Sequence, residues 1–325
     1  MYSYWNSSKD FTIGIKMSRT VIYQETKMNM SAMLPPPPPP PPPQVSSVPD
    51  LDELRANTLD NFEVVTPIEM GKEGYKVYKE FLERQGRGRE ENCYLSFGYT
   101  VNPIIQKGPQ CGMVALAMAA PLLGKQDISP DKIYSVAQSK NFTKQGELFS
   151  ADYLSRLSHQ VLNCHSEVVE MVNGKKTILQ HLLRGSILLV PYDADKNHGP
   201  CKKRGHKAHW ALLSGFLIMM DMTHLKTLKT HFKADDTHRH LYHCVDVNSI
   251  SPCETELISS ARGILVYGHQ GKSKYTGYWF LNELLDSNAN LREVGPEREP
   301  GEYIIPSGGI ISGLCGKIVG LTKSQ

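Results

Sequence analysis

Hydrophobic and polar positions follow recognisable periods only after the first sixty or so residues. In residues 73–87, Tyr75, Tyr78 and Phe81 have the three- and four-residue spacing that is typical of an amphipathic helix. Residues 110–123 then form an almost continuous apolar run, which predicts a short buried helix that stops at the following Gly.

Further elements follow from the same patterns. Two helices are predicted at 129–140 and 150–162, and each opens on a serine that can cap its first turn. Strands are predicted at 93–99, 185–193, 208–220, 262–268, 301–308 and 315–321. Because helices come first and strands later, the pattern predicts an α+β fold. The polar, His-rich residues from about 219 to 260 are interpreted as an insertion.

Residues 1–60 lack this periodicity and are predicted to be a disordered, proline-rich region ahead of one globular domain at 61–325. Every position from Pro35 to Pro43 is proline, which predicts a polyproline II rod. Such a rod fits aromatic grooves, and the preceding Leu without nearby Lys or Arg favours profilin or an EVH1-type domain over an SH3 domain. A stiff spacer is the alternative.

Composition narrows the functional classes. The 36 basic and 33 acidic residues of the 325 nearly balance, which argues against a nucleic-acid partner, and the basic cluster at 201–207 is read as a solvated loop. No apolar run reaches the roughly 20 residues that span a bilayer, and no signal peptide is recognised. The odd, irregularly spaced set of seven cysteines therefore predicts reduced thiols and a cytoplasmic protein.

Cys111 is the first candidate for chemistry. It follows a Gly-Pro-Gln turn and stands where the apolar helix is expected to begin. Backbone N–H groups and the helix dipole at that position favour a thiolate, so a lowered thiol pKa is expected. Gly112 leaves room for a substrate carbonyl, and Gln106 or Gln110 is the side chain available for an oxyanion hole.

His209 is the second candidate, at the start of the apolar strand "AHWALLSGFLIMM". A general base must be held in place and remain reachable, and the end of a strand meets both needs. A Cys that opens a helix, followed by a His that opens a strand, resembles the papain-like cysteine peptidases, and the "GPQCG" and "HWA" segments resemble a branch that includes bacterial leader-peptide-processing peptidases.

This resemblance implies a papain-like fold with Cys111 as the nucleophile, His209 as the base and Gln106 at the oxyanion, while Gln110 stays open. The third member that orients the imidazole is implied to come from the next strand, "RGILVYGHQGKSKYTGYW". Its end offers Gln270 or His269, and Asp246 is a rival that the sequence does not separate from them.

Two clusters of metal-ligating residue types form the metal alternative. One holds His198, Cys201, His206 and His209, and the other holds His238, His240, His243 and Cys244. Neither has the spacing of a recognised zinc motif, so these residues are assigned to solvated segments and no metal or cofactor is expected.

The motifs "GPQCGMVALAMA", "HWALLSG", "QGKSKY" and "GLCG", together with the polyproline run, also resemble the actin maturation proteases of vertebrates. That resemblance implies a cytosolic aminopeptidase that removes the acetylated first residue, Met or Cys, from newly made actin through a Cys thioester. It implies profilin as the partner of residues 35–43. Neither a metal nor a carboxylate clamp for an ammonium group is then required.

The basic segment around Lys203 and Arg204, with Lys202 and Lys207, is hypothesised to meet the acidic start of actin. Two other hypotheses stay open. One is a cysteine endopeptidase or deubiquitinase-like enzyme with another substrate, and the other is a catalytically inactive adaptor of profilin and actin.

Overall fold

The computed structural model describes residues 64–87, 91–244, 246–299 and 301–324. The predicted disordered region 1–60, with its polyproline run 35–43, lies outside these residues. No helix of the described part is long and apolar enough to cross a membrane.

The described strands are β1 (Asn92–Gly98), β2 (His165–Glu170), β3 (Ile187–Ala194), β4 (Pro200–Cys201), β5 (Ala208–Asp221), β6 (Phe232–Ala234), β7 (Leu241–Cys244), β8 (Gly263–Gln270), β9 (Gly277–Phe280) and β10 (Lys317–Thr322). The described α-helices are α2 (Pro67–Arg84), α3 (Cys111–Ala119), α4 (Pro130–Ser139), α5 (Ala151–Leu162), α6 (Gly174–Leu183), α7 (Leu225–Leu228), α8 (Val247–Ile250), α9 (Glu254–Ser260), α10 (Leu281–Ala289) and α11 (Gly309–Gly313).

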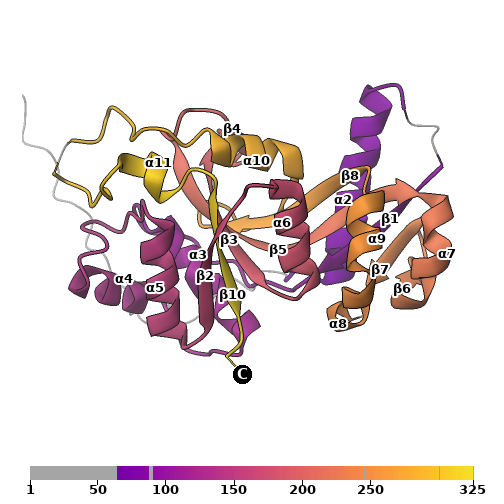
Figure 1. The fold of residues 1–325 in the computed structure, drawn as a ribbon, viewed down its shortest axis with the longest axis horizontal. Helices are drawn as coiled ribbons and strands as arrows, with labels where there is room; N and C mark the ends of the chain where they lie inside the picture. Colours follow the sequence, from indigo (N-terminus) through magenta and orange to yellow (C-terminus); the bar gives the residue numbers. More distant parts are fainter. Residues whose placement is uncertain (1–63, 88–90, 245, 300, 325) are drawn as a thin grey trace, which may run out of the picture. The chain divides into compact units, whose positions relative to one another are not determined.

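The strands form one mixed sheet in the order β2-β10-β3-β5-β1-β7-β6, with β4 beside β3 and β8 between β5 and β9 (Figure 1). The long strand β5 is central because it pairs with β3 along its first half, with β1 along its second half and with β8 on its other edge. The ends of β3 and β8 therefore lie beside the start of β5. The predicted α+β class is confirmed.

A β-bulge at Ser214 changes which face of the sheet the residues of β5 meet. Before the bulge, Ala211 and Leu213 pack in a core with α6 and α10, and after it Phe216 and Ile218 pack in the same core. Odd-numbered residues of β5 therefore face this core before the bulge and even-numbered ones after it, because the bulge inserts one extra residue. On the opposite face, α3, α4 and α5 cover the first half of the strand, and α2 covers the second half.

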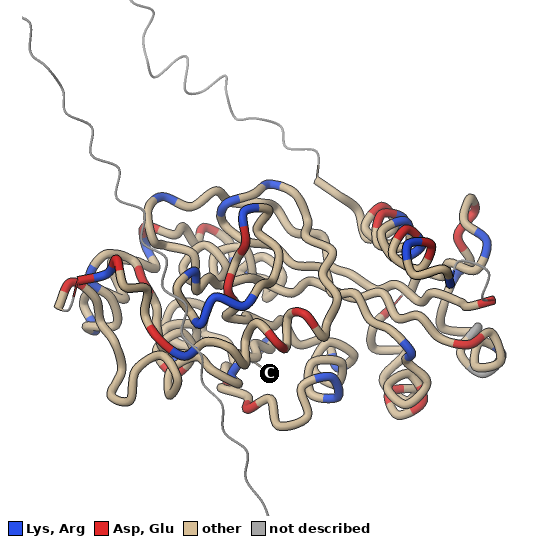
Figure 2. The backbone as a smooth tube through the Cα atoms, turned by 90° about the horizontal axis from the view of Figure 1, so that it is seen from above, with Lys and Arg blue, Asp and Glu red and all other residues tan. Residues whose placement is uncertain are grey.

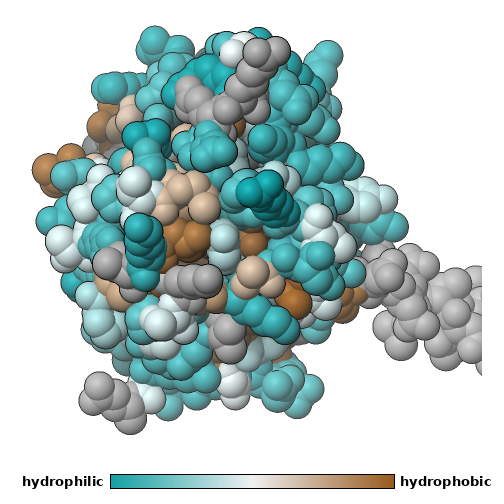
Figure 3. All heavy atoms as spheres, turned by 90° about the vertical axis from the view of Figure 1, so that its right-hand side faces the viewer, coloured by the Kyte–Doolittle hydropathy of each residue, from teal (hydrophilic) through white to brown (hydrophobic). Residues whose placement is uncertain are grey.

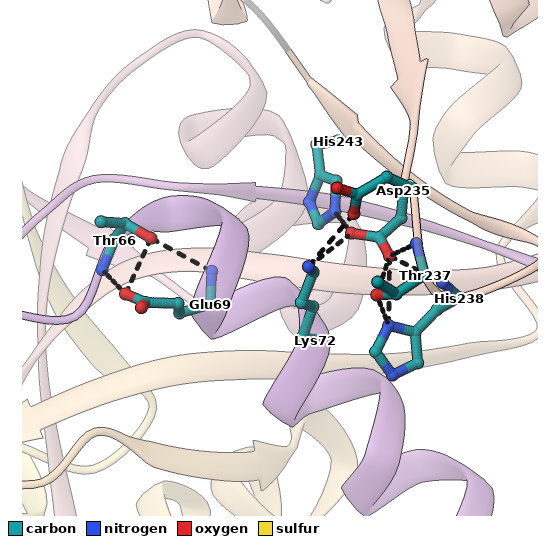
Figure 4. Close-up of polar contacts among 8 residues, drawn as sticks. Thr66, Glu69, Lys72, Asp235, Thr237, His238 and His243 are labelled. Atoms are coloured by element: carbon teal, nitrogen blue, oxygen red, sulfur yellow. Dashed lines mark hydrogen bonds and ion pairs between the residues drawn. The ribbon is translucent and has the colours of Figure 1, made fainter.

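Helix α2 confirms the amphipathic helix that the spacing predicts. Its start is a capping box, in which the Thr66 side chain accepts from the backbone N–H of Glu69 at 3.3 Å and the Glu69 carboxylate accepts from the backbone N–H of Thr66 at 2.8 Å (Figure 4). Met70, Tyr78 and Leu82 face the sheet.

The described part of the His-rich residues 219–260 contains the strands β6 and β7 and the α-helices α7, α8 and α9, and β7 pairs with β1 inside the sheet. Asp235 holds this segment together, because its carboxylate lies 2.9 Å from Nε2 of His243 and 3.1 Å from Nδ1 of His238 (Figure 4). Lys72 of α2 lies 3.6 Å from the same carboxylate. Asp235 therefore ties the segment to α2, and its two histidine partners are not confined to a solvated loop.

The strand predicted at 301–308 is wrong. These residues form turns and irregular backbone, and the backbone N–H of Ile304 donates to the buried Glu147 carboxylate at 2.8 Å instead of joining the sheet.

The capping serines of α4 and α5 are confirmed, since Ser129 and Ser150 accept hydrogen bonds from the backbone of the first turn of each helix.

Charged residues are spread over the described backbone, with basic and acidic positions interspersed (Figure 2). The face at the right-hand side of Figure 1 is mostly hydrophilic and has a small hydrophobic area near its centre (Figure 3).

Gly215 lies where β5 changes neighbour from β3 to β1, and a Cβ there would collide with the carbonyl oxygen of Phe97 and come within 2.5 Å of Cα of Gly98. We expect Gly215→Ala to lower the free energy of unfolding by about 1–3 kcal/mol, measured by urea denaturation. Gly320→Ala is the matched control, because a Cβ in that strand would meet its nearest neighbour at 3.5 Å. Equal free energies of unfolding for the two variants would contradict this account of the close packing of β5 on β1.

Candidate active site

Cys111 is the first residue of α3, as predicted, and every residue of this helix is buried. The backbone N–H groups of Trp210 and Gly112 interact with its thiol. His209 begins the buried part of β5, and it lines the same cavity of about 500 Å³ as Cys111. The two predicted catalytic residues, which are 98 positions apart, are thus brought to one cavity.

Trp210 and Gly112 explain why α3 approaches β5 at this point. The indole N–H of Trp210 donates to the backbone carbonyl of Leu148 at 2.8 Å. A Cβ on Gly112 would lie 2.9 Å from Cδ1 of Leu148 and 3.1 Å from Cδ1 of Trp210. The missing side chain of Gly112 therefore allows the helix to pack closely on the strand, a structural use beside the substrate access expected from the sequence.

Gln270 lies beside His209. It pairs with Ala211 across β8 and β5, so its side chain shares a face with His209, and it forms a hydrogen bond that favours the protonated imidazole. Burial outweighs this bond and lowers the pKa of His209 to about 3, helped by the nearby positive charges of Lys272 and Arg298. Since Nε2 of His209 is buried and has no hydrogen-bond partner in the described structure, the neutral ring can accept a proton.

The two rival candidates for the third residue lie elsewhere. His269 points to the other face of β8, where its Nε2 is 2.8 Å from Oγ of Ser214, and burial lowers its pKa to about 4. Asp246 precedes α8 and accepts from the backbone N–H of Asn248 at 3.0 Å. Of the three residues that the sequence leaves open, the structure places Gln270 next to the imidazole.

Gln106 lines the cavity, whereas the side chain of Gln110 packs against Gly146. The backbone N–H of Gln106 donates to the carbonyl of Gly271 at 2.7 Å, and its Nε2 donates to the carbonyl of Gly108 at 2.5 Å. A side-chain amide carries two N–H groups, so Gln106 keeps one donor for a second acceptor.

The expectation of a lowered thiol pKa is wrong for this structure. Burial raises the pKa of Cys111 above its ordinary value, and the N–H groups of Trp210 and Gly112 only partly oppose this effect. The helix terminus is present as predicted, but removal of the sulfur from water is the larger influence. Both shifts favour the uncharged forms, the thiol of Cys111 and the neutral imidazole of His209.

The basic segment is shaped by Asp193, a fully buried residue that the sequence did not single out. Its carboxylate accepts from the backbone N–H groups of Lys203 and Gly205 at 2.8 Å each, and of Lys207 at 2.9 Å. Three converging donors fix the path of this loop. As a result, Lys203 and Lys207 line the cavity.

The other two basic residues of the segment are held by ion pairs. Lys202 lies 2.9 Å from Asp286, and the Arg204 guanidinium binds Glu293 with its closest N–O distance at 2.8 Å. Arg204, predicted to contact substrate, is thus directed to Glu293. His206 contacts the same carboxylate at 2.9 Å. Within the described residues, no group of three or more His, Cys, Asp or Glu side chains is placed to hold a metal ion.

Comparisons with known proteins identify the family. Residues 101–217 match the family model described as "Actin maturation protease-like, C-terminal domain". The chain is 34% identical to the actin maturation protease of Bos taurus, with 77% of this chain and 78% of the relative covered. It is 37% identical to that of Xenopus tropicalis (75% and 79% covered) and 34% identical to that of Drosophila melanogaster (72% and 79% covered).

The chain belongs to the actin maturation protease family. The matched region 101–217 contains Gln106, Cys111, His209 and the basic segment, whereas Gln270 lies beyond it. No solved structure matches the chain.

Alkylation tests the neutral resting state of the Cys111–His209 pair in this family member. A thiol with a raised pKa forms more thiolate as pH increases, so we expect the rate of iodoacetamide reaction at Cys111 to rise continuously from pH 6 to pH 9. Mass spectrometry of the modified peptide gives the rate. A rate that is already constant between pH 5 and pH 7 would reveal a preformed thiolate–imidazolium pair instead.

Asp193→Asn tests the support of the basic segment. The amide replaces an accepting oxygen by an N–H group that faces backbone donors, so we expect the free energy of unfolding to fall by about 1–3 kcal/mol. Hydrogen exchange at Lys203 and Gly205 should also become faster. Asp286→Asn, which removes an exposed ion pair, should cost less than about 1 kcal/mol. Unchanged exchange in Asp193→Asn would refute this role.

Proposed function

We propose that the protein is a papain-like cysteine aminopeptidase that removes the acetylated first residue, Met or Cys, from immature actin. The observation that carries this proposal is the cavity that a helix-start thiol, Cys111, and an imidazole with an unpaired, buried Nε2, His209, both line. Relatives named actin maturation protease support actin as the substrate. The mixed α+β fold is compatible with the papain-like class.

In the proposed reaction, His209 accepts the proton of the Cys111 thiol as the sulfur attacks the carbonyl carbon of the acetylated residue. This order suits a pair that rests in its neutral form, because the proton moves as the new bond develops. The free N–H of Gln106 and the backbone N–H beside the sulfur donate to the oxyanion. Gln270 keeps the imidazole in its orientation.

The tetrahedral intermediate then collapses. The carbon–nitrogen bond breaks, His209 returns the proton to the leaving nitrogen, and actin departs with a new amino terminus. Water hydrolyses the remaining thioester, with His209 as the base, and this step releases the acetylated amino acid and restores the thiol. An acetylated terminus carries no ammonium group, so the proposed site needs no carboxylate to bind one.

We also propose profilin as the partner of residues 35–43, which lie outside the described residues, and the cytoplasm as the location. Profilin would bring its bound actin close to the enzyme, and such tethering raises the effective concentration of a substrate without any new contact at the active site. Of the basic residues suggested by the sequence, Lys203 is the one that faces the cavity without an ion pair among the described residues.

A peptide assay tests the proposed reaction. We expect the wild-type protein to release the acetylated first residue from a synthetic actin N-terminal peptide, and Cys111→Ala to lower this rate at least about a thousandfold. Mass spectrometry of the products measures both rates. Cleavage of ubiquitin chains but not of the peptide would favour a deubiquitinase-like enzyme, and rescue of actin processing in cells by Cys111→Ala would favour the inactive adaptor.

The third residue is tested in the same assay. Gln270→Ala should lower kcat at least about tenfold, because the imidazole loses its orienting hydrogen bond. Asp246→Asn is the matched control, since asparagine caps a helix as well as aspartate does and this residue precedes α8. A large loss in Asp246→Asn with none in Gln270→Ala would reverse the assignment.

A further inference from the structure

The cavity that holds Cys111 and His209 has an excess of positive charge. Five basic side chains and three acidic ones line it. The basic residues are Lys196, Lys203, Lys207, Lys272 and Arg298, and the acidic ones are Glu147, Asp195 and Glu297.

Among the described residues, one of the three carboxylates, Glu297, forms an ion pair with a basic side chain of the cavity. Glu147 accepts four hydrogen bonds, three of them from backbone N–H groups. Asp195 accepts from two backbone N–H groups of its own turn. Glu297 pairs with Lys207 at 3.5 Å. Within the described part of the chain, the other four basic side chains of the cavity form no ion pair.

Arg298 is held in place by aromatic rings. Its guanidinium lies 4.8 Å from the ring centroid of Phe149 and 5.3 Å from that of Tyr303. Such cation–π contacts fix the direction of the side chain without using its N–H donors in an ion pair. A planar group with several donors is suited to bind a carboxylate through two parallel hydrogen bonds.

Lys272 enters the cavity from the turn that follows β8. Its backbone N–H donates to Oε1 of Gln270 at 2.7 Å, which ties this turn to the residue beside His209. The charges of Lys272 and Arg298 act on both Cys111 and His209, so both cations lie close to the reacting groups.

We propose that Arg298 and Lys272 bind acidic side chains of the substrate, next to the bond that Cys111 attacks. This inference rests on the proposed peptidase function and adds the two residues that select a peptide with carboxylates close to the cleaved bond. It also moves the expected acid-binding role from Arg204, which Glu293 occupies, to two residues outside the basic segment. Lys203 provides further positive charge in the same cavity.

Two acetylated peptides test the proposal. They are identical except that two aspartates after the first residue in one peptide are asparagines in the other. The wild-type protein should show a kcat/KM at least about tenfold higher for the acidic peptide. Arg298→Gln and Lys272→Gln should lose most of this preference, through a rise in KM for the acidic peptide that exceeds any change on the neutral one. Arg298→Lys should restore part of it.

Lys202→Gln is the matched control, because this lysine pairs with Asp286 and does not line the cavity. It should keep the preference for the acidic peptide. Equal losses on both peptides in Arg298→Gln, an equal loss of preference in Lys202→Gln, or no preference in the wild-type protein would each overturn the proposal while leaving the peptidase function in place.

A binding measurement separates this proposal from the proposed reaction. Fluorescence anisotropy follows the labelled acidic peptide on Cys111→Ala with and without Arg298→Gln. Binding that weakens about tenfold on loss of Arg298 supports the proposal, even where the wild-type protein cleaves neither peptide and the proposed reaction fails. Failure of the acidic peptide to bind, or binding that is independent of Arg298, would overturn it.

Discussion

The packing of the first turn of α3 against the start of β5 is the contact on which the site depends. Gly112 has no side chain to separate the two elements, and Trp210 anchors the strand to the carbonyl of Leu148. The same contact places Cys111 and His209 at one cavity and removes both from water. The shared cavity and the desolvation therefore have one structural cause, and desolvation favours the uncharged form of each group.

Much of the fold follows from local pattern. The apolar runs predict α3, β3, β5 and β8, because a segment buried on both faces needs little else to identify it. The edge strand β2, with its alternating exposed positions, and the short helix α6 are not predicted. Residues 301–308 have the composition of a strand, but their backbone binds Glu147, a contact that no local pattern contains.

The residues of the candidate site likewise fall into those that the sequence predicts and those that only the tertiary structure reveals. Cys111 and His209 are predictable because each has a local context, a helix start and a strand start. Lys272 and Arg298 are isolated basic residues in polar segments, and only the tertiary fold brings them to the cavity. The thiol pKa is mispredicted for a related reason, since the helix terminus is visible in the sequence and the burial that outweighs it is not.

The burial of Cys111 has a consequence for how fast its sulfur is oxidised. Peroxides oxidise the thiolate form of cysteine much faster than the thiol, and solvent access sets how often they meet the sulfur. Cys111 is 8% exposed, and burial raises the pKa of its thiol, so both routes are restricted. Burial and a raised pKa therefore both act to slow the oxidation of this sulfur in the protein without substrate.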